Sequence, residues 1–410
     1  MVEQREFGMA ALRIALFTYS TKARGGVVHT LSLAKALQEI GHSVHIFALS
    51  SGEGFFRSVN VPHTLVGCPV DEAETIEHRV SRRIGAYCSY LSRLTERFDI
   101  YHAQDCISAN ALLELRNQGL IQSFVRTVHH VDDFRSPSLI DCQRKSIIEP
   151  DYLIVVSDLW KRQLLVEFGA AATLIHNGVE IERFGAARNA AGNNSAFRSS
   201  LGLEDCDLML SVGGVEPRKN TLTGLRAFVR ARETLAREGR RLVWFIAGGV
   251  TLFDYIDYRE AFFAECRKID AGEELRLLGP VSDEELGALY READLLLFPS
   301  VKEGWGLVVL EAMAMGLPVI ASKVSPLTEY LTHEENALLV EAMDHKGFAS
   351  QIVRLLSEPE VAGDLKEAGK KTASEFTWRR TAQEHVAFYE RVLDGAHDAF
   401  GAAACRKAAL

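Results

Sequence analysis

Residues 298–318 read FPSVKEGWGLVVLEAMAMGLP, and this stretch combines a strand, a glycine-rich loop and a helix start. The apolar run that ends at Phe298 predicts a buried strand. Gly304 and Gly306 then interrupt the chain before a second apolar run begins at Leu307. A strand, a loop and a helix in this order are typical of one βα unit of a parallel sheet. The stretch therefore predicts an α/β fold.

The same alternation extends from this stretch toward both ends of the chain. In the second half, apolar runs predict strands at 208–212, 242–247, 275–278, 295–298 and 318–321, and helical patterns occupy 221–236 and 283–291. In the first half, strands are predicted at 12–17, 43–49, 100–102, 124–128, 152–156 and 174–176, with helices at 28–40 and 79–97. Two such series predict two doubly wound, Rossmann-like domains.

A change in composition separates the two series. Between Gly185 and Ser200 the chain is rich in Ala, Asn, Gly and Ser, which indicates a linker or a surface excursion. We therefore predict domains at 1–185 and 186–377 that face each other across a cleft, the default ligand site for such sheets. Residues 378–410 follow as a separate segment, whose helix either caps the second domain or crosses back to the first.

The composition excludes several classes of protein. The 410-residue chain is 47% hydrophobic and 25% charged, as expected for a globular protein, and its net charge of −9 argues against non-specific nucleic-acid binding. Seven cysteines without a C-x-x-C pair favour reduced thiols over disulfides or zinc. The chain has no signal-peptide pattern and no apolar run of 18 residues. We expect a cytoplasmic protein, with peripheral contact at the inner face of the membrane left open.

The loop between the strand at 295–298 and the next helix is suited to an anion. Gly304 and Gly306 allow close approach of the backbone to a ligand, and the free N–H groups at Leu307 and Val308 would bind a diphosphate.

Two glutamates flank this loop. Glu311 lies one turn into an apolar helix, where vicinal ribose hydroxyls could satisfy its carboxylate, and Glu303 could hold sugar hydroxyls. The alternative is that Glu311 accepts backbone N–H groups and that Glu303 is a solvated loop acid.

A second loop of the same kind follows the strand at 208–212. Residues 211–220 read SVGGVEPRKN, so that Gly214, Arg218 and Lys219 precede the helix at 221–236. A cation, backbone donors and a helix dipole together suit a phosphate. The alternative is a surface loop whose Asn220 merely caps the helix.

The two loops, in this order and spacing, resemble the retaining family 4 glycosyltransferases (glycosyl transferases group 1). The resemblance extends over nearly the whole chain, and its further motifs lie at 25–26, 127–129, 156–158, 176–179 and 279–286. It implies a GT-B fold in which Glu303 contacts the donor sugar, Glu311 binds the nucleotide ribose and Lys219 binds the donor diphosphate.

The resemblance also selects residues of the first domain. His129 matches a family histidine that reaches the donor sugar, which makes it a candidate catalytic residue together with Glu303. Gly25 and Gly26 match a loop near the donor phosphate or the acceptor. A structural histidine and a plain turn are the alternatives. His102 and Asp105 are weaker candidates for the acceptor side.

The chain departs from the family pattern in three places. Gly214 stands where many members carry an arginine, and Arg218 is a candidate replacement for that charge. Trp305 replaces the usual Phe. Residues 325–329 read SPLTE where many members have a Gly-Gly pair, which leaves the donor sugar open.

The resemblance implies a hexosyltransferase of glycan or glycoconjugate biosynthesis that uses a UDP- or GDP-sugar and needs no metal or other cofactor. The acceptor is a sugar, a lipid-linked compound or a small molecule, and the oligomeric state stays open. A nucleotide-sugar epimerase and a non-catalytic nucleotide-sugar-binding module are the alternatives. Arginines at 79, 82, 83, 93 and 97 form either a solvated helix face or a surface for an anionic acceptor or lipid.

Overall fold

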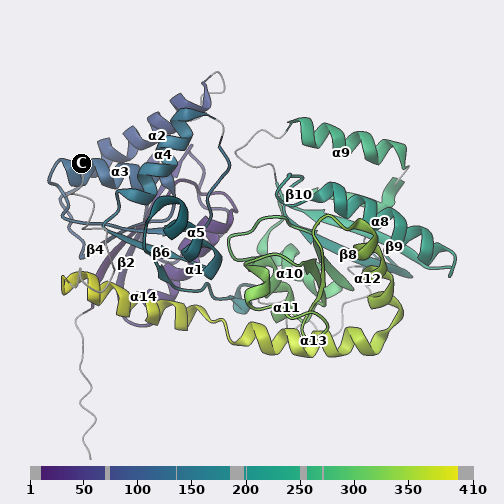
Figure 1. Cartoon of the computed structure of the whole chain (residues 1–410). Helices are drawn as coiled ribbons and strands as arrows, with labels where there is room; N and C mark the ends of the chain where they lie inside the picture. The colour runs from purple at the N-terminus through teal and green to yellow at the C-terminus, as the bar shows by residue number, and fades with distance from the viewer. Residues whose placement is uncertain are drawn as a thin grey trace, which may run out of the picture. The chain divides into compact units, whose positions relative to one another are not determined.

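The computed structural model describes residues 11–69, 74–134, 136–184, 198–199, 201–249, 256–269 and 272–395 (Figure 1). The chain folds into two compact units. The first unit extends to His176 and resumes at Trp378, and the second comprises Asn177–Thr377. The predicted linker between Gly185 and Ser200 lies outside the described residues, apart from 198–199. The two predicted Rossmann-like domains are confirmed.

The first unit contains a parallel sheet whose described strands have the order β3-β2-β1-β4-β5-β6-β7. The strands are β1 (Arg13–Thr18), β2 (Ser43–Ser50), β3 (His63–Gly67), β4 (Ile100–Ala103), β5 (Val125–Val128), β6 (Tyr152–Val155) and β7 (Thr173–Leu174). Because β1 pairs with both β2 and β4, the chain winds outward from β1 in both directions. This is the doubly wound arrangement, in which ligands bind beyond the carboxyl ends of the strands near the reversal.

Helices alternate with these strands. They are α1 (Gly25–Glu39), α2 (Ile76–Leu91), α3 (Cys106–Asn117), α4 (Pro137–Ile148), α5 (Asp158–Phe168) and, from the end of the chain, α14 (Trp378–Leu393). Side chains cap three of the helix starts: Thr75 accepts from the N–H of His78, Asp105 from that of Ser108 and Ser157 from that of Trp160. Each cap satisfies an N–H that has no partner within its helix.

The last helix, α14, belongs to the first unit and packs on α1. The hydroxyl of Tyr389 lies 2.7 Å from Nδ1 of His102 on β4, and the Thr381 hydroxyl donates to the carbonyl of His176 at 2.9 Å. Tyr389, His102 and His385 are each fully buried. Polar contacts inside the core therefore fix the register of α14 against the sheet.

The second unit contains a parallel sheet whose described strands have the order β10-β9-β8-β11-β12-β13. The strands are β8 (Cys206–Val212), β9 (Arg241–Ala247), β10 (Leu275–Gly279), β11 (Leu295–Phe298), β12 (Val319–Ser322) and β13 (Leu338–Val340). The helices are α8 (Thr221–Ala236), α9 (Ile256–Lys268), α10 (Asp283–Glu292), α11 (Leu307–Ala314), α12 (His345–Ser357) and α13 (Pro359–Ser374). Short 3-10 turns occupy Ile181–Phe184, Gly272–Glu274 and Leu327–Glu329.

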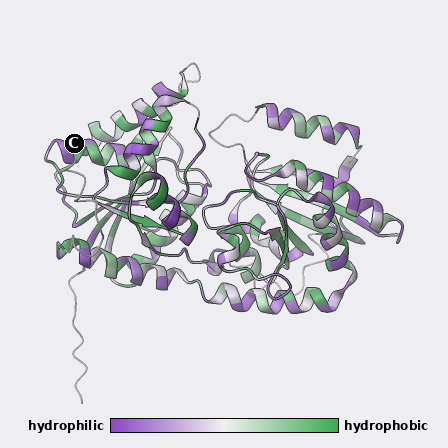
Figure 2. Ribbon diagram, viewed as in Figure 1, coloured by the Kyte–Doolittle hydropathy of each residue, from purple (hydrophilic) through white to green (hydrophobic). Residues whose placement is uncertain are grey.

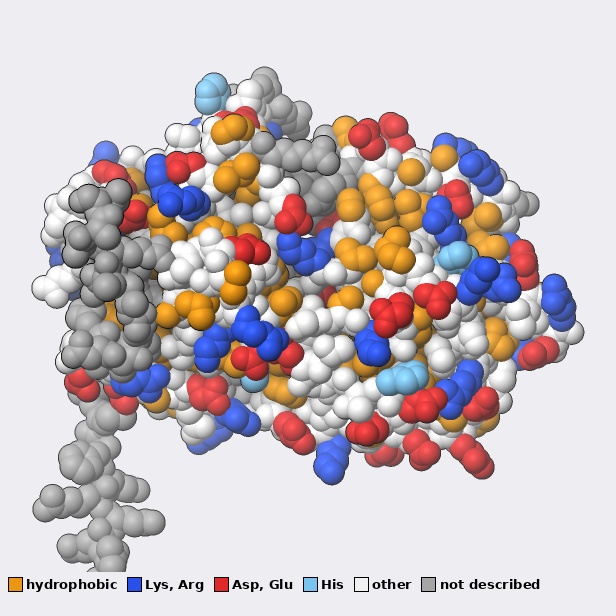
Figure 3. Space-filling view, in the orientation of Figure 1, with side chains coloured by type: hydrophobic (Ala, Val, Ile, Leu, Met, Phe, Trp, Pro, Cys, Tyr) orange, Lys and Arg blue, Asp and Glu red, His pale blue; other side chains and the backbone are white. Residues whose placement is uncertain are grey.

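Hydrophobic residues concentrate on the strands, whereas the helices alternate hydrophobic and hydrophilic residues along their length (Figure 2). In the second unit, Trp244 of β9 is fully buried and packs against Phe228 of α8. On the face shown in Figure 3, basic and acidic side chains are interspersed. None of the described helices has the length and apolar content needed to cross a membrane.

The structure corrects some predicted elements. The helix predicted at 79–97 is α2, which begins at Ile76 behind the cap of Thr75 and ends at Leu91. The sequence did not predict the strands β3 and β13. β3 alternates exposed and buried residues at the edge of its sheet, and β13 has only three residues, so neither gives a clear apolar run.

Acid should destabilise the first unit through His385. Burial lowers the pKa of His385 to about 4, although its contact with the Thr381 carbonyl opposes this. Between pH 6.5 and 4 the unfolded chain therefore binds more protons than the folded chain, so stability is lost as the pH falls through this window. We expect His385 alone to contribute a loss on the order of 3 kcal/mol, which thermal unfolding at pH 7 and pH 4.5 would detect.

The variant His385→Asn keeps a polar side chain without a titrating group in this range. It should lose less stability than the wild type over the same pH change, whereas His78→Asn, at an exposed position of α2, should behave like the wild type. Equal losses in the wild type and in His385→Asn would contradict the assignment.

Candidate functional site

Two loops of the second unit meet beyond the carboxyl ends of neighbouring strands. One follows β8 and the other follows β11, and these strands pair in parallel, with Leu296 beside Leu210. The N–H of Val301 donates to the carbonyl of Arg218 at 2.9 Å, which joins the loops directly. Parallel pairing therefore brings the two predicted anion-binding loops together at one edge of the sheet.

Asn220 ties these loops more firmly. Its backbone is left-handed, with φ of 54°, and its side-chain amide donates to the carbonyls of Pro299 at 3.0 Å and Ala342 at 2.7 Å. The side chain makes no capping bond to α8. Asn220 thus stands at the N-cap position of α8, as the alternative had it, but its side chain braces the loop after β11 instead of capping the helix.

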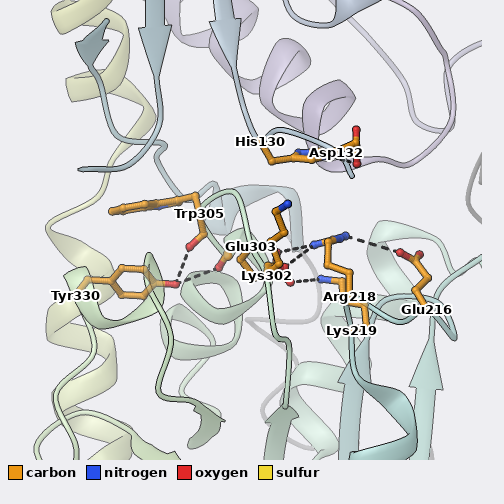
Figure 4. A network of polar contacts seen from close by, with 10 residues as sticks. His130, Asp132, Glu216, Arg218, Lys219, Lys302, Glu303, Trp305 and Tyr330 are labelled. Atoms are coloured by element: carbon orange, nitrogen blue, oxygen red, sulfur yellow. Dashed lines mark hydrogen bonds and ion pairs between the residues drawn. The ribbon is translucent and has the colours of Figure 1, made fainter. Parts of the chain in front are cut away.

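Glu303 lies between two cations (Figure 4). Lys219 Nζ donates to its Oε1 at 2.8 Å, and Arg218 donates to its Oε2 at 2.9 Å. Burial raises the pKa of this carboxyl, but the charges of Arg218 and Lys219 outweigh burial and lower the pKa to about 2. Since Glu303 is only 6% exposed, the alternative of a solvated loop acid is wrong.

Lys219 is held by its surroundings as well as by Glu303. Its Nζ lies 4.6 Å from the centroid of the Phe298 ring, a cation–π geometry. Burial lowers the pKa of Lys219, and the charge of Glu303 opposes that shift. A Cβ atom on Gly213, whose φ is 137°, would lie 2.9 Å from Cε of Lys219. Glycine at 213 thus lets the lysine side chain pass across the backbone.

Close approach of a neighbouring loop explains why position 214 is a glycine. A Cβ atom at this position would lie 2.5 Å from the carbonyl oxygen of Gly249. The backbone of the loop after β9 therefore leaves no room for the arginine that the family pattern carries here. The guanidinium of Arg218 instead stands beside Lys219 on the same carboxylate.

The loop from Pro299 ends at Gly306, which starts α11 in a left-handed conformation with φ of 94°. A Cβ atom there would lie 2.7 Å from Cδ2 of Leu327 and 2.8 Å from the Tyr330 hydroxyl. That hydroxyl donates to the carbonyl of Trp305 at 3.1 Å and holds the loop in place. The helix thus begins at Leu307, and its first N–H groups have no acceptor within the helix.

Glu311 is buried inside α11, one turn from the helix start, with 5% exposure. The Tyr290 hydroxyl donates to its Oε2 at 2.9 Å. Tyr290 belongs to α10 and was missed by the sequence analysis, because a tyrosine on an amphipathic helix looks like an ordinary core residue. The structure gives Glu311 a side-chain partner that helps to orient its carboxylate.

In the first unit, His129 follows β5 and lies at one end of a hydrogen-bonded chain. Its Nε2 is 3.2 Å from Oε1 of Gln104, whose amide nitrogen is 3.2 Å from Nε2 of His102. Burial lowers the pKa of His129 well below its usual range, with His29 contributing, so the ring is neutral at pH 7. A Cβ atom on Gly26 would lie 3.6 Å from Cδ2 of His129, an ordinary van der Waals distance, so the start of α1 lies beside this ring.

The other first-unit candidates have different places. Gly25 has open space around its Cα. His102 is fully buried between Thr127 and Tyr389 and therefore does not line an acceptor surface, contrary to its weak prediction. Asp105 caps α3 and accepts from the N–H of Tyr19. Across the described ranges, no group of three or more His, Cys, Asp or Glu side chains is placed to hold a metal ion.

Comparisons with known proteins agree with this geometry. Residues 193–372 match the family model described as glycosyl transferases group 1, and residues 23–183 match that of glycosyltransferase family 4. The D-inositol 3-phosphate glycosyltransferase of Saccharomonospora viridis is 27% identical over 398 residues, which cover 91% of this chain and 90% of that protein.

Solved structures share the fold. Sucrose-phosphate synthase from Thermosynechococcus elongatus has a TM-score of 0.75 at 22% identity, covering 94% of this chain and 100% of that one. HepE from Anabaena, solved in complex with UDP-glucose, has a TM-score of 0.71 at 16% identity, with coverage of 94% and 100%. The expected GT-B fold is confirmed.

The geometry around Gly306 predicts a steric effect. Gly306→Ala should destabilise the second unit by roughly 1–3 kcal/mol, because alanine disfavours a positive φ and its methyl group would meet Leu327 and Tyr330. Thermal unfolding measures the change. Gly363→Ala on α13, where the added methyl group meets nothing within 4 Å, should be neutral or stabilising. If the two variants melted alike, the packing described for Gly306 would be wrong.

Proposed function

The chain belongs to the family 4 glycosyltransferases, and on that premise we propose that it transfers a hexosyl group from a UDP- or GDP-sugar to an acceptor hydroxyl, with retention of the anomeric configuration. The observation that carries the proposal is the pair of cations on Glu303, beside the start of α11. Two half-buried cations close to the first N–H groups of α11 suit a diphosphate, which carries two negative charges.

The diphosphate is proposed to bind to Lys219, Arg218 and the first N–H groups of α11, at Leu307 and Val308. Gly304 lets the backbone approach the ligand, while Gly214 and Gly306 let the two loops pack against Gly249 and against Leu327 and Tyr330 beside it. In the absence of donor, Glu303 pairs with both cations, and a second acid, Glu216, lies 3.9 Å from Arg218. When the donor binds, the cations share their charge between Glu303 and the diphosphate.

The nucleoside is proposed to bind through Glu311. Its carboxylate can accept hydrogen bonds from the two ribose hydroxyls, while the Tyr290 hydroxyl steadies Oε2 at 2.9 Å. A carboxylate that is 95% buried needs donors to offset its desolvation, and vicinal hydroxyls supply two of them.

The chemistry follows from where the charge develops. As the bond between the sugar and the diphosphate breaks, negative charge grows on the leaving oxygen, and Lys219, Arg218 and the helix start stabilise it without a metal ion. Glu303 would orient sugar hydroxyls. His129 of the first unit is proposed to contact the donor sugar as a neutral ring. Acceptor attack on the face from which the diphosphate departs gives retention.

The donor choice is supported by one neighbour, because HepE from Anabaena was solved with UDP-glucose. Thermal shift with UDP, GDP and their sugars would identify the nucleotide, since a ligand stabilises the folded state according to its concentration relative to its Kd. Incubation with donor alone then distinguishes a transferase from an epimerase, because only an epimerase interconverts the donor sugar without an acceptor.

Lys219→Ala should weaken UDP or GDP binding by roughly 1.5–3 kcal/mol, because it removes a charge-assisted contact to the diphosphate. Isothermal titration calorimetry measures the loss. Lys323→Ala, which removes an exposed lysine of the same unit, is the matched control and should bind like the wild type. Unchanged affinity in Lys219→Ala would remove this lysine from the donor site.

The variant Glu311→Gln distinguishes the contribution of the ribose to binding from that of the diphosphate. The variant should bind the nucleoside diphosphate more weakly by about 1–3 kcal/mol and lose transfer activity, because the amide cannot accept both ribose hydroxyls as the carboxylate does. Its affinity for inorganic pyrophosphate should stay unchanged, whereas Lys219→Ala should weaken both ligands. Equal loss of pyrophosphate and nucleotide binding in Glu311→Gln would argue against a ribose contact.

A further inference from the structure

Two thiols of the first unit lie against each other where α3 packs on α4. Cys106 is the first residue of α3 and is half-buried, whereas Cys142 lies within α4 and is 9% exposed. Both cysteines are free thiols, and the two helices are in contact. Neither thiol takes part in the proposed glycosyl transfer, so the pair is a separate candidate site.

Asn110 of α3 holds the two cysteines side by side. Its side-chain amide donates to the carbonyl of Cys106 at 2.8 Å and to that of Cys142 at 2.9 Å. The same nitrogen lies 3.4 Å from Sγ of Cys142. Because a single nitrogen contacts both residues, the two cysteines are close neighbours across the contact between the helices.

The two sulfurs also share a hydrogen bond, which the thiol of Cys106 donates to the sulfur of Cys142. This bond and burial both raise the pKa of Cys106. For Cys142 the same bond is the largest influence and lowers the pKa, although burial and the charges of Asp105 and Asp141 oppose it. Cys142 is therefore the more easily ionised thiol of the pair, and the thiolate is the nucleophilic form of cysteine.

A buried cation near the pair favours that thiolate. Arg126 of β5 is 6% exposed, and its Nε and Nη1 have no hydrogen-bond partner among the described residues. Burial lowers the pKa of Arg126, and the charges of Asp105, Cys106 and Cys142 oppose this shift. A negative sulfur near Arg126 therefore reduces the cost of burying its guanidinium.

The other described cysteines have different surroundings. Burial raises the pKa of Cys88 and of Cys266 to about 11 and also raises that of Cys206, which keeps these thiols protonated. Cys68 is 7% exposed and accepts a hydrogen bond from Arg82 at 2.9 Å. Cys68 is thus the single thiol that competes most closely with the pair for an oxidant.

We propose that Cys106 and Cys142 form a redox site that a hydroperoxide closes into a reversible disulfide between α3 and α4. Hydrogen peroxide is small enough to reach a thiol that is 9% exposed, and the half-buried neighbour gives it access. Reversible disulfides of this kind serve as redox sensors in proteins whose thiols are otherwise reduced. The site does not depend on the proposed function, because no donor or acceptor takes part.

The oxidation proceeds in two steps. The Cys142 thiolate attacks one peroxide oxygen, the O–O bond breaks, and a sulfenic acid forms while the departing hydroxide takes up the proton that Cys142 had lost. The sulfur of Cys106 then attacks the sulfenic sulfur, the S–O bond breaks, and the oxygen leaves as water with the proton of Cys106. Two thiols and one peroxide thus give one disulfide and two waters, and two electrons pass from sulfur to oxygen.

The disulfide would tether the loop after β5, which carries His129. Gln143 of α4 accepts from the N–H of Asp132 at 2.8 Å and donates to its carbonyl at 2.9 Å. Gln104, before α3, lies 3.2 Å from Nε2 of His129. Each glutamine lies within two residues of one cysteine of the pair, so the bond would connect the two supports of this loop.

Peptide mapping under non-reducing conditions tests the site. A few molar equivalents of hydrogen peroxide should link the peptides that contain Cys106 and Cys142 in the full-length protein, and dithiothreitol should separate them again. Cys142→Ser should not form this link. Cys88→Ser, which changes a half-buried thiol of α2, is the matched control and should form it like the wild type.

Cys106→Ser tests the order of the two steps. Without the second thiol, a sulfenic acid should accumulate on Cys142, where dimedone traps it as a thioether that mass spectrometry detects. Melting temperatures in dithiothreitol show that each variant is folded. Trapping at Cys68 in place of Cys142 would contradict the assignment of the nucleophile.

Hydrogen exchange measures the tether. In the oxidised protein, the amides of α4 and of the loop before it should exchange severalfold more slowly than in the reduced protein, while those of α2 stay unchanged. Unchanged exchange at Asp132 in protein that carries the bond would overturn the tether.

Oxidation of Cys68 while both thiols of the pair stay reduced would overturn the redox site, as would a disulfide that forms first between other cysteines. The peptide map separates the expected bond from any that involves Cys405, which lies outside the described residues. Failure of the protein to bind UDP or GDP would refute the proposed function and leave the disulfide result standing.

Discussion

The carboxylate of Glu303, held between Lys219 and Arg218, is the interaction on which the second unit's candidate site depends. Two cations so close together repel each other, and burial adds to the cost of charging them. The acid offsets both effects and keeps the cations in place when no ligand is bound. The same arrangement prepares them for an anion, because a diphosphate can take over part of the pairing.

The parallel direction of the strands brings the other parts of the site together. Because neighbouring strands are parallel, the loops after β8 and β11 leave the sheet at the same edge, and Asn220 locks them together. Glycines then remove side chains where backbones approach closely, as Gly214 does against Gly249. In the first unit, the hydroxyl of Tyr389 on α14 lies 2.7 Å from Nδ1 of His102, which holds that helix on the sheet.

The sequence predicted the two doubly wound sheets well, because buried parallel strands read as short apolar runs. The family resemblance also implied that Glu303 and Lys219 contact the same donor, with Arg218 a candidate replacement for a missing charge. The sequence could not show that Glu303 pairs with both cations, that Tyr290 contacts Glu311, or that Asn220 braces a neighbouring loop, since these contacts join residues distant in sequence. His102, by contrast, looked like a strand-end ligand and is a buried partner of α14.

A crystal structure of the protein with a bound UDP- or GDP-sugar tests the central claim most directly. The account predicts diphosphate oxygens within hydrogen-bonding distance of Lys219 Nζ and of the first N–H groups of α11, and ribose hydroxyls on Glu311. A nucleotide bound elsewhere, with Lys219 still paired to Glu303 and Arg218 to Glu303 and Glu216, would contradict it.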